Sequence, residues 1–404
     1  MNPPVIPDDL VLRNGTGGRI LLLVLDGLGG LPARPGAETE LDAARTPHLD
    51  SLAERSSLGL FHPVAPGVTP GSGPGHLALF GYDPLRYLVG RGALSALGVG
   101  FPLQPGDLAV RLNLATLDGS GRVADRRAGR PSDAEGKKVV ELVRERVKLE
   151  RGVEYFLLHE KEHRAVLIMR GGELGPHLQD TDPQAEGVEP RPPLALDGES
   201  TRSSRLMTTF LAGAGEALAD HPRVHGFLAR GYASYQGFPA FRERFGLRGV
   251  AVAGYPMYRG VARLVGMEVP GEPTSLDAQV ALLEQAGPES DFAFFHVKAT
   301  DARGEDGDYD GKVAAIQAVD EILPRILSVG WDVVCITGDH STPSTMKAHS
   351  WHPVPLLIHS SWVRPSADSF GENACRTGSL GSVRSTELMS LLLAHAGRMA
   401  KFGA

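Results

Sequence analysis

Residues 20–26 read Ile20-Leu-Leu-Leu-Val-Leu-Asp26, an apolar run that ends on an acid. The apolar runs at residues 292–297, which leads toward Asp301, and 333–337, which leads into Asp339 and His340, repeat this arrangement far along the chain. Short β-rich apolar runs of this kind are typical of buried parallel strands, and ligands of open α/β sheets gather beyond the carboxyl ends of the strands. We therefore expect the three acids that follow these runs, Asp26, Asp301 and Asp339, to converge in one crevice.

Carboxylates that lie so close together repel each other unless cations lie between them, so the pattern predicts a metal site. Further ligand types stand nearby in the sequence: His340 beside Asp339, Glu305 four residues after Asp301, and His349 and His352 within one loop. Mixed carboxylate, imidazole and hydroxyl ligation favours Mn²⁺ or Zn²⁺ over Mg²⁺, because imidazole is the softer ligand. The alternative is that these residues are turn formers and surface histidines. The role of His352 stays open.

The glycine-rich turn at residues 69–76 reads Thr-Pro-Gly-Ser-Gly-Pro-Gly-His and precedes an expected helix start at residues 77–80. Ser72 in front of that helix is a candidate nucleophile, because a bound metal lowers the pKa of a serine hydroxyl. The alternative is an ordinary helix-capping serine. His76 either faces the same pocket, as a substrate-binding residue, or is an ordinary helix residue.

A third group of candidate residues is basic and consists of arginines, three of them within residues 125–130 of the expected insert. A guanidinium binds carboxylate and phosphate through two parallel hydrogen bonds, so several arginines facing a metal cleft predict a small anionic substrate that carries both groups. Taken singly, each arginine is better explained as a surface charge, and only the cluster is informative. The candidate substrate-binding arginines are Arg91, Arg126, Arg127, Arg130, Arg230 and Arg259.

The order of expected elements indicates an α/β fold with a mostly parallel sheet and helices on both faces. Strands and helices alternate before residue 104 and again after residue 183, whereas residues 104–183 contain alternating strands and one helix. The sequence therefore predicts one α/β domain formed by residues 1–103 and 184–404, with a smaller α+β domain inserted at residues 104–183.

The bulk composition excludes several classes of protein. The chain has 404 residues, with 41 basic against 48 acidic side chains and a net charge of −7, which argues against a nucleic-acid-binding surface. No apolar run is long enough to span a bilayer, and the first residues lack the pattern of a signal peptide. Two cysteines without a paired motif favour a reducing, cytoplasmic setting. A homo-oligomer is compatible with the sequence.

Taken together and in this order, the motifs resemble those of the cofactor-independent phosphoglycerate mutases, in particular their archaeal-type branch, within the alkaline phosphatase superfamily. The resemblance runs from about Arg19 to His395. The segments that carry it are residues 23–27 (Leu-Val-Leu-Asp-Gly), 70–84, 90–92 (Gly-Arg-Gly), 125–130 (Asp-Arg-Arg-Ala-Gly-Arg), 180–183 (Asp-Thr-Asp-Pro), 296–301, 338–343 (Gly-Asp-His-Ser-Thr-Pro) and His349.

The resemblance implies an alkaline-phosphatase-like α/β domain with an inserted domain, and two divalent metals, typically Mn²⁺, with Zn²⁺, Co²⁺ or Mg²⁺ as alternatives. It implies that Ser72 takes the phosphoryl group of phosphoglycerate while arginines of the insert and its borders keep the glycerate. One metal would be held by Asp26, Ser72, Asp339 and His340, and the other by Asp301, Glu305 and His349.

Three positions depart from the family pattern. The family usually has histidine where this chain has Glu305, an acid where it has Gly73, and lysine where it has Arg259. The implied reaction is the interconversion of 2-phosphoglycerate and 3-phosphoglycerate through phosphoserine. The alternatives are another phosphatase or phosphomutase of the same superfamily, or a metabolite-binding relative with a degenerate site.

Overall fold

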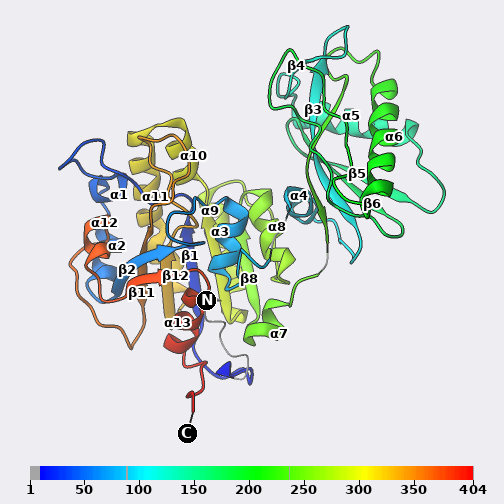
Figure 1. Cartoon of the computed structure of the whole chain (residues 1–404). Helices are drawn as coiled ribbons and strands as arrows, with labels where there is room; N and C mark the ends of the chain where they lie inside the picture. The colour runs from blue at the N-terminus through cyan, green and yellow to red at the C-terminus, as the bar shows by residue number, and fades with distance from the viewer. Residues whose placement is uncertain (1–9, 88–89, 236, 404) are drawn as a thin grey trace. The chain divides into compact units, whose positions relative to one another are not determined.

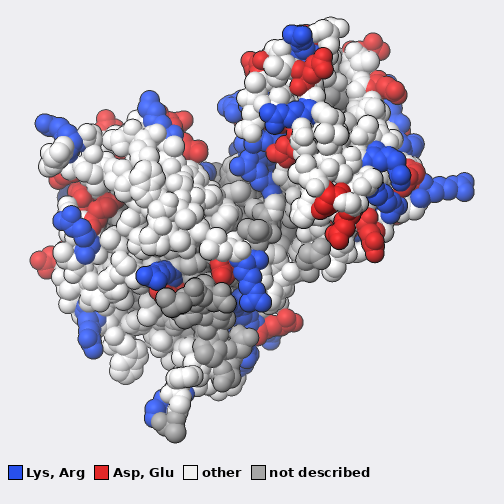
Figure 2. Space-filling view, in the orientation of Figure 1, with Lys and Arg blue, Asp and Glu red and all other residues white. Residues whose placement is uncertain are grey.

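The computed structural model describes residues 10–87, 90–235 and 237–403, and its chain divides into two compact units. The main unit comprises Met1–Leu88 and Pro239–Ala404, and the inserted unit comprises Val89–Phe238 (Figure 1). Among the described residues, no helix is both long and apolar enough to cross a membrane. Basic and acidic side chains are interspersed on the face of each unit that Figure 2 shows, so neither unit presents a surface of one sign there.

The main unit is built on a seven-stranded sheet, of which β8, β9, β1 and β10 run parallel to one another. Strand β11 is antiparallel to both of its neighbours, and β12 is parallel to β2. In sheet order the strands are β12 (Gly381–Arg384), β2 (Ser57–His62), β11 (Val354–His359), β10 (Val333–Thr337), β1 (Ile20–Leu25), β9 (Phe292–Val297) and β8 (Gly249–Ala253). The expected α/β fold class with a mostly parallel sheet is confirmed.

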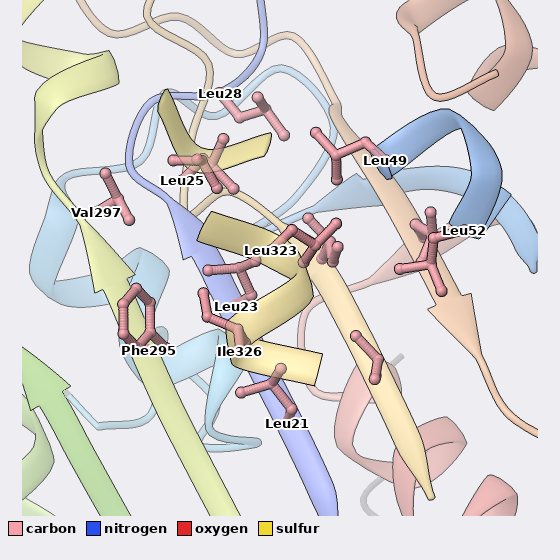
Figure 3. Packing of buried hydrophobic residues seen from close by; sticks show 14 of the residues in the cluster. Leu21, Leu23, Leu25, Leu28, Leu49, Leu52, Phe295, Val297, Leu323 and Ile326 are labelled. Carbon is pink, nitrogen blue, oxygen red and sulfur yellow. The ribbon is translucent and has the colours of Figure 1, made fainter. Parts of the chain in front are cut away.

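Strand β1 lies near the centre of this sheet, and all six of its residues are buried. Helices α2 (Pro47–Ala53) and α11 (Tyr309–Ser328) contribute to the core on one side of the sheet, where Leu323 and Ile326 of α11 lie near Leu21 and Leu23 (Figure 3). Full burial of one leucine side chain contributes roughly 2 kcal/mol. The continuous apolar run, without alternation, is what a strand covered on both faces requires.

The remaining helices of the main unit connect these strands. They are α1 (Glu40–Ala43), α3 (Ser72–Leu79), α7 (Phe241–Phe245), α8 (Pro256–Leu264), α9 (Leu276–Ala286), the short 3₁₀ helix η2 (Gly287–Glu289), α10 (Ala299–Asp306), α12 (Glu372–Arg376) and α13 (Glu387–His395).

The inserted unit has a five-stranded antiparallel sheet with β3 (Leu108–Leu117) in a central position. The other strands are β4 (Val123–Asp125), β5 (Glu154–Lys161), β6 (Arg164–Arg170) and β7 (Gly226–Ser234). One face of the sheet packs against α5 (Asp133–Arg146) and α6 (Thr201–Ala217), and alternate residues on the other face pack near α4 (Arg91–Gly98). Helix α5 begins with a reciprocal capping box between Ser132 and Glu135.

The insert is larger than the expected range 104–183. Strand β7 lies beyond that range, yet it pairs along most of β3, and α6 shares the apolar core of the same sheet. Helix α4 precedes the range and packs against β3, β6 and β7. Because these contacts belong to one sheet and its two faces, the limits of the insert are Val89 and Phe238.

Candidate active site

The candidate site lies at one edge of the main sheet. Residue Leu25 of β1 is level with Val297 of β9, and Val24 is level with Thr337 of β10, so three parallel strands end together. The chain segments that follow carry the three predicted acids, and each of these side chains is 0% exposed. The convergence expected from the sequence is therefore present in the structure.

Asp26 is surrounded by nitrogen donors. Its Oδ2 lies 3.2 Å from His296 Nε2 and 3.3 Å from Lys298 Nζ, and its Oδ1 lies 3.3 Å from His340 Nε2. Burial opposes ionisation, but the Lys298 ammonium and the two histidines hold the pKa of Asp26 well below its ordinary value. Asp26 is therefore a carboxylate at neutral pH, although it is completely buried.

Gly27, directly after Asp26, is required by the backbone. Its φ is +64°, and a Cβ atom there would lie 2.6 Å from Thr342 Oγ1 and 2.8 Å from Asp301 Oδ1. The missing side chain lets the segment after β1 approach the segments after β9 and β10. The Gly27 N–H in turn donates to Asp339 Oδ1 over 3.2 Å. This contact fixes one carboxylate oxygen of Asp339.

The second carboxylate oxygen of Asp339 points at histidines. Oδ2 lies 3.2 Å from His340 Nε2 and 3.2 Å from His76 Nδ1, but it accepts no hydrogen bond from the described residues. Burial and the Asp26 charge oppose ionisation of Asp339, while the two histidines favour it, and its pKa lies below the ordinary value. Burial opposes protonation of His340, yet Asp339 and Asp26 raise its pKa to about 9.

Ser72 is the first residue of α3, which begins five residues before the expected helix start at residue 77. Its Oγ lies 3.4 Å from His340 Nε2. Gly75 makes this placement sterically feasible, since a Cβ atom there would lie 2.4 Å from the Asp339 carbonyl oxygen. The low intrinsic helix propensity of this glycine-rich turn is overridden by close packing of α3 against the segment after β10.

His76 lies one turn further along α3 and is 0% exposed. Its Nδ1 donates to the Ser72 carbonyl oxygen over 2.8 Å, and its ring packs against Tyr258 and Phe294 with centroids 4.6 and 5.5 Å apart. Because no part of its surface is accessible, the structure does not support a substrate contact at His76. The residue instead connects Ser72 with Asp339.

Asp301 forms a second group with two histidines. His349 Nε2 lies 3.6 Å and His340 Nδ1 3.9 Å from Asp301 Oδ1. Glu305 is one turn further along α10, and its Oε1 lies 3.6 Å from His349 Nε2, but its side chain is 53% exposed. The structure thus brings Glu305 to the rim of this group. His352 lies outside both groups, with its ring stacked on Trp351.

Ligand atoms of two sets of described residues lie within 4.8 Å of one another: Asp26, Asp339 and His340, and Asp301, His340 and His349. Oxygen and imidazole donors of this kind suit a divalent transition-metal ion. Asp26 Oδ1 and Asp339 Oδ2 are buried and accept no hydrogen bond from the described residues, so each has a lone pair to offer. The residues present therefore fit divalent metal ions.

The sequence interpretation missed two residues at this edge. His296, at the end of β9, is 1% exposed and bonds to Asp26, and its ring stacks on Tyr258 with centroids 3.8 Å apart. Lys298 contacts both Asp26 and Asp301 through its Nζ. Burial opposes its charge, but the two carboxylates raise the pKa of Lys298 above the ordinary value. The available signal was a histidine inside a buried apolar strand and a lysine directly after that strand.

The candidate arginines of the inserted unit differ in their surroundings. Arg126 makes two hydrogen bonds, of 2.8 and 2.7 Å, to Asp182, which is 0% exposed, and Arg230 Nη1 lies 3.5 Å from the same carboxylate. Burial opposes ionisation of Asp182, whereas Arg126 lowers its pKa below the ordinary value. Arg126 is therefore held by an acid of its own unit. Arg91, Arg127 and Arg130 are exposed.

The turn that carries two of these arginines has an unusual backbone. Ala128, Gly129 and Arg130 all have positive φ, of 47°, 67° and 50°. Asp125 stabilises the turn, because its carboxylate accepts the backbone N–H groups of Arg127 and Gly129 over 2.7 and 2.6 Å. Left-handed backbone at residues other than glycine is typical of functional segments.

Arg111, which the sequence interpretation also missed, lies on β3 directly opposite Arg230 of β7. Burial and the nearby Arg164, Arg91 and Arg230 lower its pKa to about 10, and Glu160 acts in the opposite direction. Like charges opposite each other on paired strands are destabilising. This cluster of four arginines is therefore suited to an anion.

Arg259 of the main unit is 4% exposed and already has partners. Its Nη1 donates to the Gly254 carbonyl oxygen over 2.8 Å, and its Nη2 lies 3.1 Å from Glu272 Oε2. Burial lowers the pKa of Arg259, and Glu272 partly restores it. In this arrangement the guanidinium ties the segment after β8 to a neighbouring loop.

Comparisons with known proteins agree on one family. The family model of 2,3-bisphosphoglycerate-independent phosphoglycerate mutase matches residues 53–223. A relative from Thermus thermophilus, named "Probable 2,3-bisphosphoglycerate-independent phosphoglycerate mutase", is 52% identical over 397 residues, which cover 97% of this chain and 98% of that one.

Two solved structures share the fold along nearly the whole chain. The PH0037 protein from Pyrococcus horikoshii has a TM-score of 0.83 and 31% identity, with 96% of this chain and 100% of that chain covered. A cofactor-independent phosphoglycerate mutase from Thermoplasma acidophilum has a TM-score of 0.70 and 29% identity, with 94% and 100% covered. The chain therefore belongs to the family of 2,3-bisphosphoglycerate-independent phosphoglycerate mutases.

Proposed function

We propose that this enzyme interconverts 2-phosphoglycerate and 3-phosphoglycerate through a phosphoserine on Ser72, with two bound divalent cations, Mn²⁺ being the expected ion. The observation that carries the proposal is the position of Ser72 Oγ, 3.4 Å from His340 Nε2 and therefore beside the two buried carboxylates that flank this ring. A hydroxyl in such a place is a suitable nucleophile, since bound cations lower its pKa and neutralise phosphoryl oxygens.

The ligand sets proposed for the two cations are those that the resemblance implies. Asp26, Asp339, His340 and the Ser72 hydroxyl would hold one ion. Asp301, His349 and Glu305 would hold the other, with the accessible carboxylate of Glu305 completing the set at the rim. A glutamate at this position adds negative charge where the family usually has a neutral imidazole, and harder oxygen ligation favours Mn²⁺ over Zn²⁺.

In the forward direction, the Ser72 hydroxyl gives up its proton as its Oγ attacks the phosphorus of 3-phosphoglycerate. The bond from phosphorus to the substrate O3 breaks, and O3 takes up a proton as the glycerate hydroxyl. The C2 hydroxyl of the same glycerate then attacks the phosphoserine and loses its proton, which releases Ser72 and gives 2-phosphoglycerate. Each transfer exchanges one P–O bond for another, so no water and no bisphosphorylated intermediate is required.

The glycerate must stay bound between the two transfers, or water would compete for the phosphoserine. We assign this task to arginines of the inserted unit. The exposed Arg91, Arg127 and Arg130, together with Arg230, are the expected contacts, and the strained turn at residues 128–130 supports a functional role for its arginines. Arg126 contributes indirectly, by holding Asp182 beside Arg230.

A coupled assay tests the proposal. Protein loaded with Mn²⁺, and in parallel with Co²⁺, Zn²⁺ or Mg²⁺, is supplied with 3-phosphoglycerate, and enolase converts any 2-phosphoglycerate formed. Isomerisation without added 2,3-bisphosphoglycerate is the expected result. Release of inorganic phosphate without isomerisation would identify a phosphatase instead, and binding without turnover would identify a degenerate, metabolite-binding relative.

A further inference from the structure

One lysine that none of the proposed steps uses is completely buried against the segments that carry the proposed metal ligands. Lys312 lies in the first turn of α11, and its side chain is 0% exposed. The helix begins at the N-cap Asp308, whose Oδ1 accepts the Gly311 N–H over 2.9 Å and so fixes the direction of this turn. Lysine is almost never fully buried unless its charge and all of its donors are satisfied.

All three N–H donors of the Lys312 ammonium have backbone acceptors. The Nζ atom lies 3.0 Å from the carbonyl oxygen of Gly27, 3.1 Å from that of Gly29 and 2.9 Å from that of Thr342. The nearest carboxylate oxygen, Glu40 Oε1, is 4.0 Å away. The ammonium is thus held by three carbonyl groups, and Glu40 is the largest of several acidic contributions that compensate its charge.

These carbonyl groups belong to the two segments that carry ligands of the first proposed metal. Gly27 directly follows Asp26, and Thr342 stands two residues after His340. The two segments also bond to each other, because the Thr342 N–H lies 3.2 and 3.1 Å from the carbonyl oxygens of Gly27 and Gly29. The ammonium therefore connects the segment after β1 to the segment after β10 by hydrogen bonds to both.

The hydroxyl group of Thr342 connects these two segments to the second proposed metal site. Thr342 Oγ1 lies 2.6 Å from Asp301 Oδ1 and 2.9 Å from His340 Nδ1. Asp301 belongs to α10, which directly precedes α11. Glu40, the acid beside Lys312, accepts the Ser344 N–H over 2.8 Å and so holds the same segment from its other side.

We infer that Lys312 is a positioning residue for both proposed metal sites, and that it acts by holding the backbone after Asp26 and the backbone around Thr342 at a fixed separation. The inference rests on the proposed function. A buried ammonium that donates to three carbonyl oxygens fixes the distances among them. An apolar side chain of equal length makes no such hydrogen bonds and leaves these distances free to change. When a residue that orients the ligands of a metal ion is removed, the affinity of the site for the metal typically falls about 10- to 100-fold.

A structural role alone would lower stability without changing the metal sites, so the test needs a control of equal burial. Arg398 provides it: its side chain is 1% exposed, and it donates to the carbonyl oxygens of Gly18 and Gly17 over 2.9 and 3.3 Å. These residues precede β1, whereas Gly27 and Gly29 follow it. Lys312→Met and Arg398→Met therefore each remove a buried tether, at opposite ends of the same strand.

The measurements are calorimetric titration of the metal-free full-length protein with Mn²⁺ and the visible absorption spectrum of its Co²⁺ form. We expect Lys312→Met to bind Mn²⁺ about 10- to 100-fold more weakly than the wild type and to shift the Co²⁺ bands. Arg398→Met is expected to lower the melting temperature but to keep the wild-type affinity and spectrum. If Lys312→Met does not fold, Lys312→Gln, which retains two donors, is expected to show a smaller change in the same direction.

Wild-type affinity and spectrum in the folded Lys312 variant would overturn the inference and leave the proposed function intact. Equal losses of affinity in the Lys312 and Arg398 variants would also overturn it, because a general loss of stability would then be the cause. A wild-type protein that binds neither ion would overturn the proposed metal sites and this inference together.

Discussion

The imidazole rings of His340 and His349 are stacked, with their centroids 3.6 Å apart and their planes at 21°. His340 also faces Asp26 and Asp339, whereas His349 faces Asp301 and lies near Glu305. The two proposed metal sites are therefore adjacent, and the two stacked rings lie between them. A change of charge in one site is expected to change the electrostatic potential in the other, because only these largely buried rings separate them.

Removal of metal ions is expected to destabilise the protein. The buried carboxylates of Asp26 and Asp339 repel each other without a cation, and an ion bound only to the folded chain stabilises it by about 2.7 kcal/mol at a hundredfold excess over its dissociation constant. The melting temperature, measured by calorimetry, should fall after chelation and recover with Mn²⁺.

Asp339→Asn is the matched control for this experiment. It removes one of the repelling charges, so the metal-free variant is expected to match or exceed the metal-free wild type in melting temperature and to gain much less from Mn²⁺. A chelator that leaves the wild-type melting temperature unchanged would contradict the proposed metal sites.

Ser72→Ala is expected to abolish isomerisation while it leaves folding nearly unchanged, since Ser72 is only partly buried and its Oγ lies 3.4 Å from His340 Nε2, a long contact. Turnover is measured in the enolase-coupled assay, and transfer of labelled phosphoryl groups to the protein is followed in parallel. Ser344→Ala changes another serine of the main unit and should still become labelled. Labelling of the Ser72→Ala protein would exclude this residue as the phosphoryl acceptor.

Substitutions of Glu305 test the least enclosed proposed ligand. Glu305→Ala removes a donor at the rim, 3.6 Å from His349, and is expected to weaken binding of one of the two Mn²⁺ ions by roughly tenfold or more, with little loss of stability because the side chain is 53% exposed. Glu305→His should restore two-ion binding and shift the preference from Mn²⁺ toward Zn²⁺. Metal content and affinity, measured by calorimetric titration, decide the outcome. Two-ion stoichiometry and wild-type affinity in Glu305→Ala would remove Glu305 from the ligand set.

Arg111→Met is expected to have opposite effects on stability and on substrate binding. Removing one member of the arginine cluster relieves repulsion in the ligand-free protein, so the free energy of unfolding should rise by about 0.5–1 kcal/mol. An anionic substrate loses a partner, so KM for 3-phosphoglycerate should rise roughly tenfold or more, with a smaller change in kcat. Arg151→Met, at an exposed position of the same unit, serves as control. A lower free energy of unfolding with an unchanged KM would show that Arg111 is structural.

His163 should make the protein less stable in mild acid. Burial and the neighbouring arginines lower its pKa from an ordinary value near 6.5 to about 4. Between these values the unfolded chain takes up a proton that the folded chain does not, so stability is full above about pH 6.5 and falls as the pH drops toward 4. The complete effect is on the order of 3 kcal/mol.

The check is the free energy of unfolding from urea denaturation at several pH values across this window. His163→Asn is expected to lose this part of the pH dependence, while His48→Asn, at an exposed position, should keep it. Parallel pH profiles for the wild type and His163→Asn would show that His163 titrates normally in the folded protein.

The parts of the fold that the sequence predicted well are those determined by burial. The expected strands at residues 20–25, 292–297 and 333–337 have these limits in the structure, because each is an apolar run buried on both faces and bounded by polar residues. The acids that follow them converge as expected. This geometry follows from parallel pairing in register, which any sheet of this class imposes.

The parts that were missed depend on contacts between distant residues. Strand β7 joins the insert because it pairs with β3, more than a hundred positions earlier, and no local pattern reports such a pairing. Helix α10 was missed because half of the residues in Ala299–Asp306 are charged and the segment lacks apolar periodicity. Arg111 and Lys312 were missed because their importance comes from neighbours on other strands and loops.

The central position of β1 has a consequence for synthesis of the chain. Strand β1 has its two partners, β9 and β10, about 270 and 310 residues later in the chain. At about 5–20 residues per second, its six apolar residues wait roughly 15 s to 1 min for their first neighbour. During that time the nascent segment is an unpaired strand that can associate with other chains, so we expect holdase chaperones to improve the yield of this protein.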